Sequence, residues 1–538
     1  MLRKHWSLAG SERVNTLDMP LQAFLSRTAE VFPDKTAIMY GVQKVSYRQL
    51  DEWSSRFANA LVVNCGVKKG DRVALFLLNG PQFVVAYFGV LKAGAVVTVI
   101  SPLHKELEVE QQLCDSGAQS IVVLESLYAI VERVMGKTLL RNVIVTGVRE
   151  GEVCFGGLGV CAGLNVFDFW GLIEKSVVEL LDFRFVSGGD LAVLQYTSGT
   201  ASVPKGVMLS HTNLVSNVSV FASWIKGVCS DVFLSVLPFF HVYGMTTSML
   251  TPISLGAEMV LLSRFDVMEC LRVINQCRVS VFCGSSSMFS MLSEAGGFER
   301  CDLSSIRVCI SGASRLLSHV QERFMRAGVF LVEGYGLTEA SPVTHCTPID
   351  RSVGLVKLGS VGLALPGTDV RIVDVETGCR EVAVGEVGEL CVRGLQVMCG
   401  YWQDPVGTAR VLREGWLFTG DIVYTDSDGY VYIVDRKKDL IKCKGYSVYP
   451  RELEDVLYGH PAVKFCVVIG KPDVLYGEVP KAFVVFKEGF TVTREELVEF
   501  VNSKIAGYKA LGDVELCSEL PYGFGGKVLR RVLEEGKV

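Results

Sequence analysis

Short apolar runs alternate with amphipathic stretches along the first part of the chain. The apolar runs predict strands over residues 36–40, 72–78, 95–100 and 120–124, and helical spacing predicts helices over 21–32, 47–63, 83–92 and 106–115. Ser46 and Gln49 form a capping box for the second of these helices. Strands that alternate with helices are typical of parallel sheets covered on both faces. The pattern therefore predicts an α/β fold, without an internal repeat.

The pattern of apolar and charged residues changes after the apolar run that begins at Val431. A charged cluster follows at Asp435–Asp439, and beyond it we expect helices over 450–457 and 493–505 and strands over 465–469 and 482–486. These elements predict a small α+β unit. We therefore expect two domains, residues 1–434 and 435–538, with a hinge at Asp435.

Composition and charge exclude several classes of protein. The chain has 538 residues, 49% hydrophobic and 21% charged, with a net charge of -5. It lacks the basic excess of a nucleic-acid binder, so we expect no such partner. The apolar region 73–100 is broken by polar residues and indicates a buried βαβ unit instead of a membrane span. Without a signal peptide or Cys-x-x-Cys pairs among its 17 cysteines, the chain is expected to be reduced and cytoplasmic.

A polar loop follows the apolar run 191–194. It reads Tyr-Thr-Ser-Gly-Thr-Ala-Ser-Val-Pro-Lys-Gly over residues 196–206 and precedes a helix that opens at Ser210. Hydroxyls, a flexible Gly199 and the charge of Lys205 are suited to polyphosphate. The loop is no Walker motif, because Pro204-Lys205-Gly206 stands where that motif needs Gly-Lys-Ser/Thr. A solvated turn is the alternative for this segment taken alone.

Further along, several apolar strands end in small or polar residues. In parallel sheets, ligands bind at those carboxyl ends. The segment 331–339 ends in an aromatic ring, two flexible glycines, a hydroxyl and a carboxylate. The ring face suits a nucleotide's base, the hydroxyl suits a phosphate and the carboxylate suits Mg²⁺. Asp421 is suited to ribose hydroxyls. For His241 the alternative is a packed, hydrogen-bonded structural role. For the Thr-Gly-Asp turn at 419–421 and the Gly-rich tail that ends in Lys527, the alternative is a solvated surface segment.

These segments, in this order, resemble the adenylate-forming superfamily, which includes acyl-CoA synthetases, firefly luciferase and the adenylation domains of peptide synthetases. The resemblance spans about residues 21–531. Within the superfamily, segments 237–244, 331–347 and 396–402 are most similar to bacterial long-chain fatty acid–CoA ligases. The resemblance implies a large AMP- and acyl-binding domain and a small mobile lid. It also implies ATP and CoA as co-substrates and Mg²⁺ as a cofactor, with acyl-AMP as the intermediate.

The resemblance also implies a role for each matching residue. Lys527, Thr338 and Glu339 would be catalytic, and Glu339 would bind Mg²⁺. The residues implied for ATP and AMP are Thr197, Ser198, Gly199, Thr200, Lys205, Gly312, Ala313, Ser314, Gly334, Tyr335, Gly336, Asp421 and Arg436. Those implied for the acyl pocket are His241, Tyr243, Gly244 and Gly284. Those implied for the hinge and the CoA side are Asp435, Lys442, Gly445 and Tyr446.

Four pairs or runs depart from the usual pattern of the superfamily. They are Ala201-Ser202, Ser285–Ser287, Ser314-Arg315 and Tyr522-Gly523. Three other functions stay open: loading a separate carrier protein, activating a cinnamate-type acid, and binding acyl chains or nucleotide without catalysis. Acyl length and oligomeric state are not determined by the sequence. Because a fatty acid partitions into bilayers, transient contact with the inner membrane face is a further hypothesis.

Overall fold

The computed structural model describes residues 19–147, 165–179, 186–197, 204–349, 356–443, 446–473, 475–490, 492–521 and 528–534. The chain divides into two compact units. The first comprises Met1–Leu358, Ala364–Asp369 and Arg393–Gly415, and the second comprises Gly359–Leu363, Val370–Val392 and Trp416–Val538. The strand that holds Asp435 pairs with the strand before it, and the predicted boundary between residues 434 and 435 stays a prediction. The hinge at Asp435 stays a prediction.

One sheet of the first unit contains the strands on either side of the predicted polyphosphate loop. Its strand order is β19-β9-β8-β4-β3-β5-β6-β7, and the pairs from β8 to β7 are parallel, whereas β8–β9 and β9–β19 are antiparallel. Its strands are β3 (Arg72–Phe76), β4 (Val96–Val99), β5 (Ser120–Leu124), β6 (Asn142–Thr146), β7 (Asn165–Asp168), β8 (Leu191–Thr197), β9 (Lys205–Ser210) and β19 (Gly400–Tyr401). The predicted strands over 72–78, 95–100 and 120–124 correspond to β3, β4 and β5.

A second sheet of the first unit supplies most of the other strand ends. Strands β14, β13, β12, β10, β11 and β1 run parallel in that order, whereas β15 is antiparallel to β14 and β2 is antiparallel to β1. The bounds are β1 (Thr36–Tyr40), β2 (Gln43–Ser46), β10 (Val232–Ser235), β11 (Glu258–Leu261), β12 (Val281–Ser285), β13 (Val308–Gly312), β14 (Leu331–Gly336) and β15 (Val343–Cys346). Two further short strands are β16 (Leu363–Ala364) and β20 (Leu412–Arg413).

The helices of the first unit largely follow the sequence pattern, and the Ser46–Gln49 capping box is present at the start of α2. They are α1 (Ala23–Val31), α2 (Tyr47–Val63), α3 (Pro81–Lys92), α4 (Glu106–Ser116), α5 (Tyr128–Val134), α6 (Phe169–Lys175), α7 (His211–Trp224), α8 (Val242–Gly244), α9 (Thr251–Leu255), α10 (Val267–Gln276), α11 (Ser286–Glu294), α12 (Ser318–Arg326) and α13 (Pro405–Val411). Residues Met245–Leu250 form a π-helical segment between α8 and α9.

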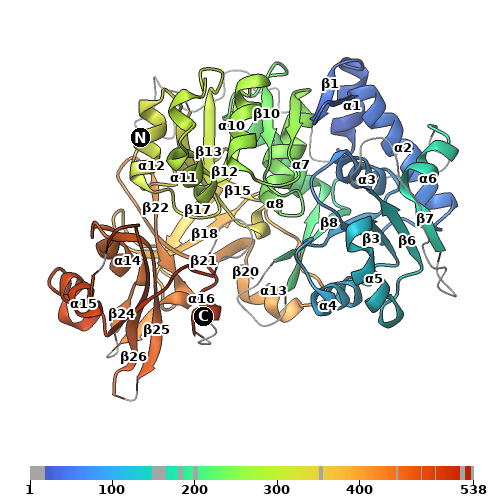
Figure 1. Cartoon of the computed structure of the whole chain (residues 1–538). Helices are drawn as coiled ribbons and strands as arrows, with labels where there is room; N and C mark the ends of the chain where they lie inside the picture. The colour runs from blue at the N-terminus through green and yellow to red at the C-terminus, as the bar shows by residue number, and fades with distance from the viewer. Residues whose placement is uncertain are drawn as a thin grey trace. The chain divides into compact units, whose positions relative to one another are not determined.

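Helices cover both faces of the second sheet. Side chains of α10, α11 and α12 pack on one face together with Phe282 and Cys309, and these helices flank β10, β12 and β13 in Figure 1. Phe221 of α7 packs on the opposite face, among Val281, Ile310 and other strand residues. Burial of strands on two faces explains their unbroken apolar runs. The predicted α/β fold is confirmed.

The second unit contains two antiparallel-rich sheets. One is built from β17 (Asp369–Val373), β18 (Gly388–Arg393), β21 (Trp416–Thr425) and β22 (Val431–Arg436). The other is built from β23 (Ile441–Cys443), β24 (Tyr446–Val448), β25 (Val463–Asp473), β26 (Gly477–Phe486) and β27 (Asp513–Leu516). Helices α14 (Pro450–Tyr458), α15 (Arg494–Asn502) and α16 (Arg530–Glu534) accompany them.

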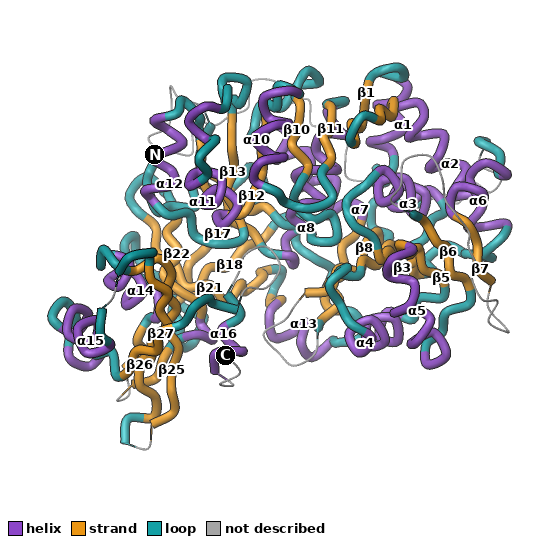
Figure 2. Tube along the Cα trace, viewed as in Figure 1, coloured by secondary structure: helices purple, strands orange, loops and turns teal. Residues whose placement is uncertain are grey.

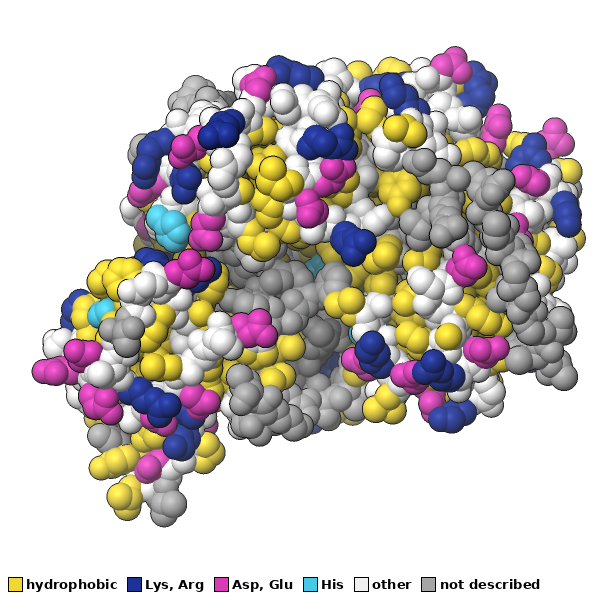
Figure 3. Space-filling model, viewed as in Figure 1, with side chains coloured by type: hydrophobic (Ala, Val, Ile, Leu, Met, Phe, Trp, Pro, Cys, Tyr) yellow, Lys and Arg dark blue, Asp and Glu magenta, His cyan; other side chains and the backbone are white. Residues whose placement is uncertain are grey.

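Strands β25 and β26 are longer than predicted and form an extended hairpin (Figure 2). In the described part of the chain, no helix is long and apolar enough to cross a membrane. Acidic and basic side chains intermix on the described part of the face drawn in Figure 3.

Candidate active site

The β8–β9 hairpin frames the predicted polyphosphate loop. Thr197 pairs with Lys205, and Tyr196 pairs with Gly206, so the two ends of the loop are held side by side. The Tyr196 hydroxyl donates to Asp115, which anchors the end of β8 to helix α4. Ser198, Gly199 and Thr200, with the departure at Ala201-Ser202, lie outside the described residues.

The Lys205 side chain contacts two residues that lie about 200 positions later in the chain, Tyr401 and Asp404. Its Nζ is 2.9 Å from Asp404 Oδ2 and 4.6 Å from the centre of the Tyr401 ring. Asp404 also caps α13, where its Oδ1 accepts from the Gly407 backbone N–H. The positive charge of Lys205 is therefore balanced by the Asp404 carboxylate and oriented by the Tyr401 ring.

Glu339 approaches the same tyrosine from the other side. The Tyr401 hydroxyl donates to Glu339 Oε1 at 2.8 Å. Glu339 lies in a single turn, Thr338–Ala340, that directly follows β14. A Cβ on Gly336 would lie 2.0 Å from the Pro342 carbonyl oxygen, so only glycine fits where the chain leaves this strand. The fold thus brings the predicted lysine and the predicted metal-binding carboxylate to one aromatic ring.

The donor set suits magnesium. Mg²⁺ is usually held by one or two carboxylates together with substrate phosphates and waters. Among the residues described, no group of three or more His, Cys, Asp and Glu side chains could hold a metal ion. Glu339 supplies one carboxylate of the kind that such a site uses.

The end of β13 contains a strained turn. Ala313 has a φ of 69°, a left-handed conformation that is unfavourable for a residue with a Cβ. The neighbouring Ser314 hydroxyl lies 2.6 Å from the Ser286 hydroxyl, so this departure from the superfamily pattern joins the turn after β13 to the first residue of α11. Strained backbone of this kind is often found at functional sites.

Tyr335 of β14 packs against a buried histidine. The ring centres of Tyr335 and His345 are 5.8 Å apart, and the two residues pair across β14 and β15. Burial lowers the pKa of His345 to about 3, so the ring is neutral. Its Nδ1 lies 2.9 Å from the Thr344 hydroxyl, and this contact fixes the orientation of the His345 ring that packs against Tyr335.

His241 is exposed and begins the helical segment that follows β10. Its Nδ1 accepts from the Tyr243 backbone N–H at 3.2 Å. Gln195 of β8 and Asn79, which lies just after β3, hold the preceding segment in place. Asn79 donates to the Leu237 carbonyl and accepts from the Phe239 N–H, both at 2.8 Å. Gln195 donates to the Phe240 carbonyl at 2.9 Å.

Tyr243, Gly244 and Gly284 have clear packing roles. The buried Tyr243 hydroxyl donates to the Ile310 carbonyl at 3.0 Å and lies 3.4 Å from the Gly284 carbonyl. A Cβ on Gly312 would meet the Tyr243 ring at 2.9 Å, and one on Gly244 would lie 2.3 Å from the Pro238 carbonyl oxygen. Tyr243 therefore joins two strand ends, and its role in an acyl pocket stays a prediction.

In the second unit, Asp421 and Arg436 face each other across β21 and β22. Arg436 Nε lies 3.1 Å from Asp421 Oδ1. Asp435 is buried, and its carboxylate accepts from the backbone N–H groups of Arg436 and Arg451. Burial raises the pKa of Asp435 to about 6, so the predicted hinge carries a carboxylate that ionises close to neutral pH.

The predicted CoA-side residues lie near β23 and β24. Lys442 is exposed, and its backbone N–H donates to Glu478. Tyr446 is 57% exposed, and its ring centre lies 4.7 Å from that of Tyr508. Gly445 and Lys527, with the departure at Tyr522-Gly523, fall outside the described part of the chain.

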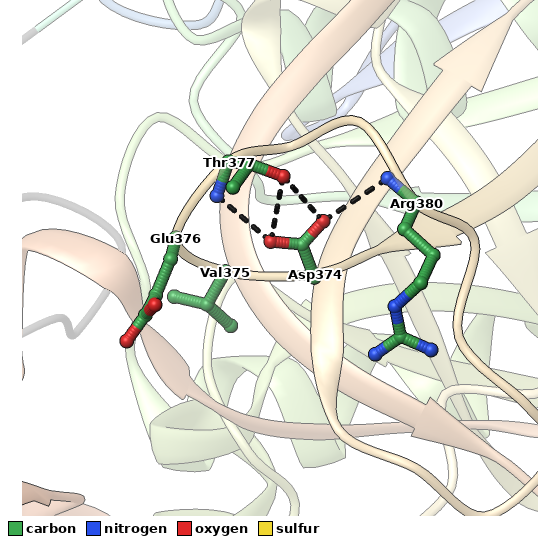
Figure 4. Close-up of a pocket in the computed structure, with 5 residues that line it drawn as sticks. All are labelled: Asp374, Val375, Glu376, Thr377 and Arg380. Carbon is green, nitrogen blue, oxygen red and sulfur yellow. Dashed lines mark hydrogen bonds between the residues drawn. The ribbon is translucent and has the colours of Figure 1, made fainter.

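A hollow of about 420 Å³ in the second unit is lined by Asp374, Val375, Glu376, Thr377 and Arg380. Figure 4 shows that the Asp374 carboxylate accepts from the backbone N–H groups of Thr377 and Arg380 and lies against the Thr377 hydroxyl. These bonds close a surface turn. None of the five residues belongs to the predicted site.

Sequence reasoning missed four residues that support the site: Asn79, Gln195, Tyr401 and Asp404. Asn79 stands directly before Gly-Pro at the end of a strand, which was a usable signal for a side chain that bonds to backbone. Tyr401 lies in the segment 396–402 that the resemblance had singled out. Neither signal identified the residue that is contacted, because Asn79 bonds to Phe239 and Tyr401 bonds to Glu339, and both pairs lie more than 60 positions apart in the sequence.

Two family models match the chain: "AMP-binding enzyme" over residues 25–402 and "AMP-binding enzyme C-terminal domain" over residues 452–526. A long-chain-fatty-acid–CoA ligase of Bacillus subtilis is 41% identical over 96% of this chain and 94% of its own length. The ligase of the same name from Escherichia coli O157:H7 is 36% identical over 94% and 93%.

A solved structure of ATP-bound MatB from Rhodopseudomonas palustris also matches. It has a TM-score of 0.87 and 28% identity, over 96% of this chain and 99% of that one. The predicted resemblance to the adenylate-forming superfamily is confirmed: the chain belongs to the AMP-binding enzyme family.

Proposed function

We propose that this chain is an AMP-forming ligase that joins a long-chain fatty acid to CoA. A fatty carboxylate is a poor acyl donor, because an oxide would have to leave. In the first step a carboxylate oxygen attacks the α-phosphorus of ATP, and pyrophosphate leaves. In the second step the CoA sulfur attacks the acyl carbon as its thiol proton is lost, and AMP leaves.

The observation that carries this proposal is the approach of Lys205 and Glu339 to the single ring of Tyr401. A lysine suited to phosphate and a carboxylate suited to Mg²⁺ are thereby held together, at the ends of two sheets, in a chain whose near-full-length relatives are fatty acid–CoA ligases. ATP is the reactant that such a pair would bind. Bound Mg²⁺ would neutralise charge on the phosphate oxygens.

We assign to the residues of the first unit the roles that the resemblance implies for them. The loop from Thr197 to Lys205 binds the β- and γ-phosphates, and Thr338 lies near the α-phosphate. Tyr335 and the Gly312–Ser314 turn border adenine, with Gly334 and Gly336 allowing close approach of the backbone. His241, with Tyr243, Gly244 and Gly284 behind it, borders the acyl chain.

Residues of the second unit serve the two steps in turn. Asp421 binds the ribose with Arg436 beside it, and Lys527 bridges the carboxylate and the α-phosphate during adenylation. Preorganised charge of this kind lowers a barrier by roughly 3–4 kcal/mol. Lys442, Gly445 and Tyr446 then serve thioester formation, after rotation about Asp435.

The test is release of AMP by the purified protein from Mg-ATP and a series of saturated fatty acids, with CoA present or omitted. Turnover that requires CoA and is highest with long chains is the expected result. Turnover without CoA but with a carrier protein would favour the carrier-loading alternative. ATP binding without AMP release from any acid would refute the proposal in favour of a non-catalytic binding protein.

A further inference from the structure

Tyr401 occupies a central position among the residues that approach the polyphosphate loop. Its hydroxyl is 2.8 Å from Glu339 Oε1, and its ring centre is 4.6 Å from Lys205 Nζ. A cation over an aromatic face and a charge-assisted hydrogen bond are both orienting contacts. One side chain therefore constrains both a cation and an anion of the site.

The backbone around Tyr401 is anchored on both sides. The Tyr401 N–H donates to the Thr408 hydroxyl at 2.8 Å, and the Trp402 N–H donates to the Gly206 carbonyl at 2.7 Å. On the other side, the Met398 N–H donates to the Glu339 carbonyl at 2.8 Å. The segment around β19 is thus fastened both to the strand that carries Lys205 and to the turn that carries Glu339.

The protonation state of Tyr401 is compatible with this role. Burial and the neighbouring Glu339 raise the pKa of Tyr401 well above its usual range. The phenol therefore keeps its proton and donates it to the carboxylate. In the described part of the chain only this donor reaches the Glu339 side chain, so Oε2 keeps its lone pairs for a ligand.

We propose that Tyr401 is a positioning residue for the metal–nucleotide end of the site: its hydroxyl orients the Glu339 carboxylate toward Mg²⁺, while its ring holds Lys205 for the phosphates. The proposal rests on the function proposed above. Hydrogen-bond donors behind a metal-binding carboxylate typically change metal affinity by about 10- to 100-fold when removed. Tyr401 acts through Glu339 and Lys205 and need not touch the reacting atoms.

The test uses Tyr401→Phe, which removes the hydroxyl but keeps the ring over Lys205. Calorimetry measures binding of α,β-methylene-ATP, whose bridging carbon blocks pyrophosphate release, with Mg²⁺ and with a chelator. We expect Y401F to weaken binding by at least about tenfold with Mg²⁺ and to leave binding unchanged with the chelator. The matched control is Tyr40→Phe, which loses a hydroxyl contact of 2.8 Å to Ser263 elsewhere in the same unit and should change neither value.

A double-mutant cycle with Glu339→Gln separates positioning from general damage. If Tyr401 acts on the metal through Glu339, Y401F has little further effect on Mg²⁺-dependent binding in the E339Q background. An equal loss in both backgrounds, or an equal loss with Mg²⁺ and with chelator, would overturn the proposal. Failure of the wild-type protein to form acyl-CoA would refute the proposed function instead, whatever Y401F does to nucleotide binding.

Discussion

Replacement of His345 by phenylalanine should remove a pH-dependent part of the stability of the first unit. His345 is fully buried, and burial lowers its pKa to about 3, against about 6.5 for an exposed histidine. Among the described residues its Nε2 has no hydrogen-bond partner. The folded chain therefore keeps His345 neutral at pH values where the unfolded chain protonates it.

The sign and size of the effect follow from this difference. A depressed pKa in the folded state gives stability that is present above pH 6.5 and is lost as the pH falls toward 3. Between pH 7.5 and 5.0 the unfolded chain takes up nearly one proton at this site, which corresponds to a loss of about 2 kcal/mol. His345→Phe cannot take up that proton and should lose about 2 kcal/mol less over the same range.

The assay is urea denaturation of both proteins at pH 7.5 and 5.0, followed by tryptophan fluorescence. For each protein, the free energy of unfolding at pH 5.0 is subtracted from that at pH 7.5, and only these differences are compared. The loss of the contact to Thr344 affects the variant at both pH values and therefore cancels. His211, whose pKa burial lowers to about 4, is common to both proteins and cancels. Equal pH dependence in both proteins would refute the reasoning, and so would an NMR signal of the His345 ring that titrates near pH 6.5.

Three further predictions concern the site and the hinge. Asp404→Asn keeps the cap of α13 but removes the charge paired with Lys205, so ATP should bind several-fold more tightly by calorimetry; unchanged or weaker binding would show that Asp404 does not compete with phosphate. Asn79→Ala should lower the unfolding free energy by about 2–3 kcal/mol in urea, because two backbone groups before His241 lose their partner; a Gln195→Ala variant tests the single bond to Phe240 in the same way. The raised pKa of Asp435, about 6, gives stability that is lost as pH rises from 4 to 6; Asp435→Asn should therefore gain about 2 kcal/mol relative to wild type between pH 4 and 7, and no relative gain would contradict the burial argument.

Local patterns in the sequence predicted most of the fold. Helix α2 begins and ends as its periodicity and its Ser46–Gln49 box indicate, and strand β5 matches its apolar run. The long β25–β26 hairpin was underestimated because the outer part of β25, Gly470-Lys-Pro-Asp473, contains none of the apolar residues that indicate a strand, and Lys471 and Pro472 are exposed. Pairing between strands extends them beyond the apolar core, and the apolar pattern of one strand does not report such pairing.

The site was predicted less completely. Residue types and spacing singled out Lys205 and Glu339, because phosphates and metals need particular chemistry. The supporting contacts of Tyr401, Asp404 and Asn79 are set by packing between distant segments, which one sequence does not show. Packing also gave Tyr243 a buried role between strand ends that its sequence context did not indicate.

The order of elements after the predicted polyphosphate loop determines which groups can supply the positive charge that attracts phosphates there. A strand, β9, follows the loop, and helix α7 starts only at His211. In a Walker-type loop a helix starts at the phosphates, and its N-terminal N–H groups supply partial positive charge. Because the whole of β9 separates the loop from α7, the N-terminal N–H groups of α7 do not lie at the end of the loop. Nucleotide affinity in this chain should therefore depend on discrete charges, the Lys205 ammonium and a divalent cation, and should fall with ionic strength more steeply than in a loop backed by a helix dipole.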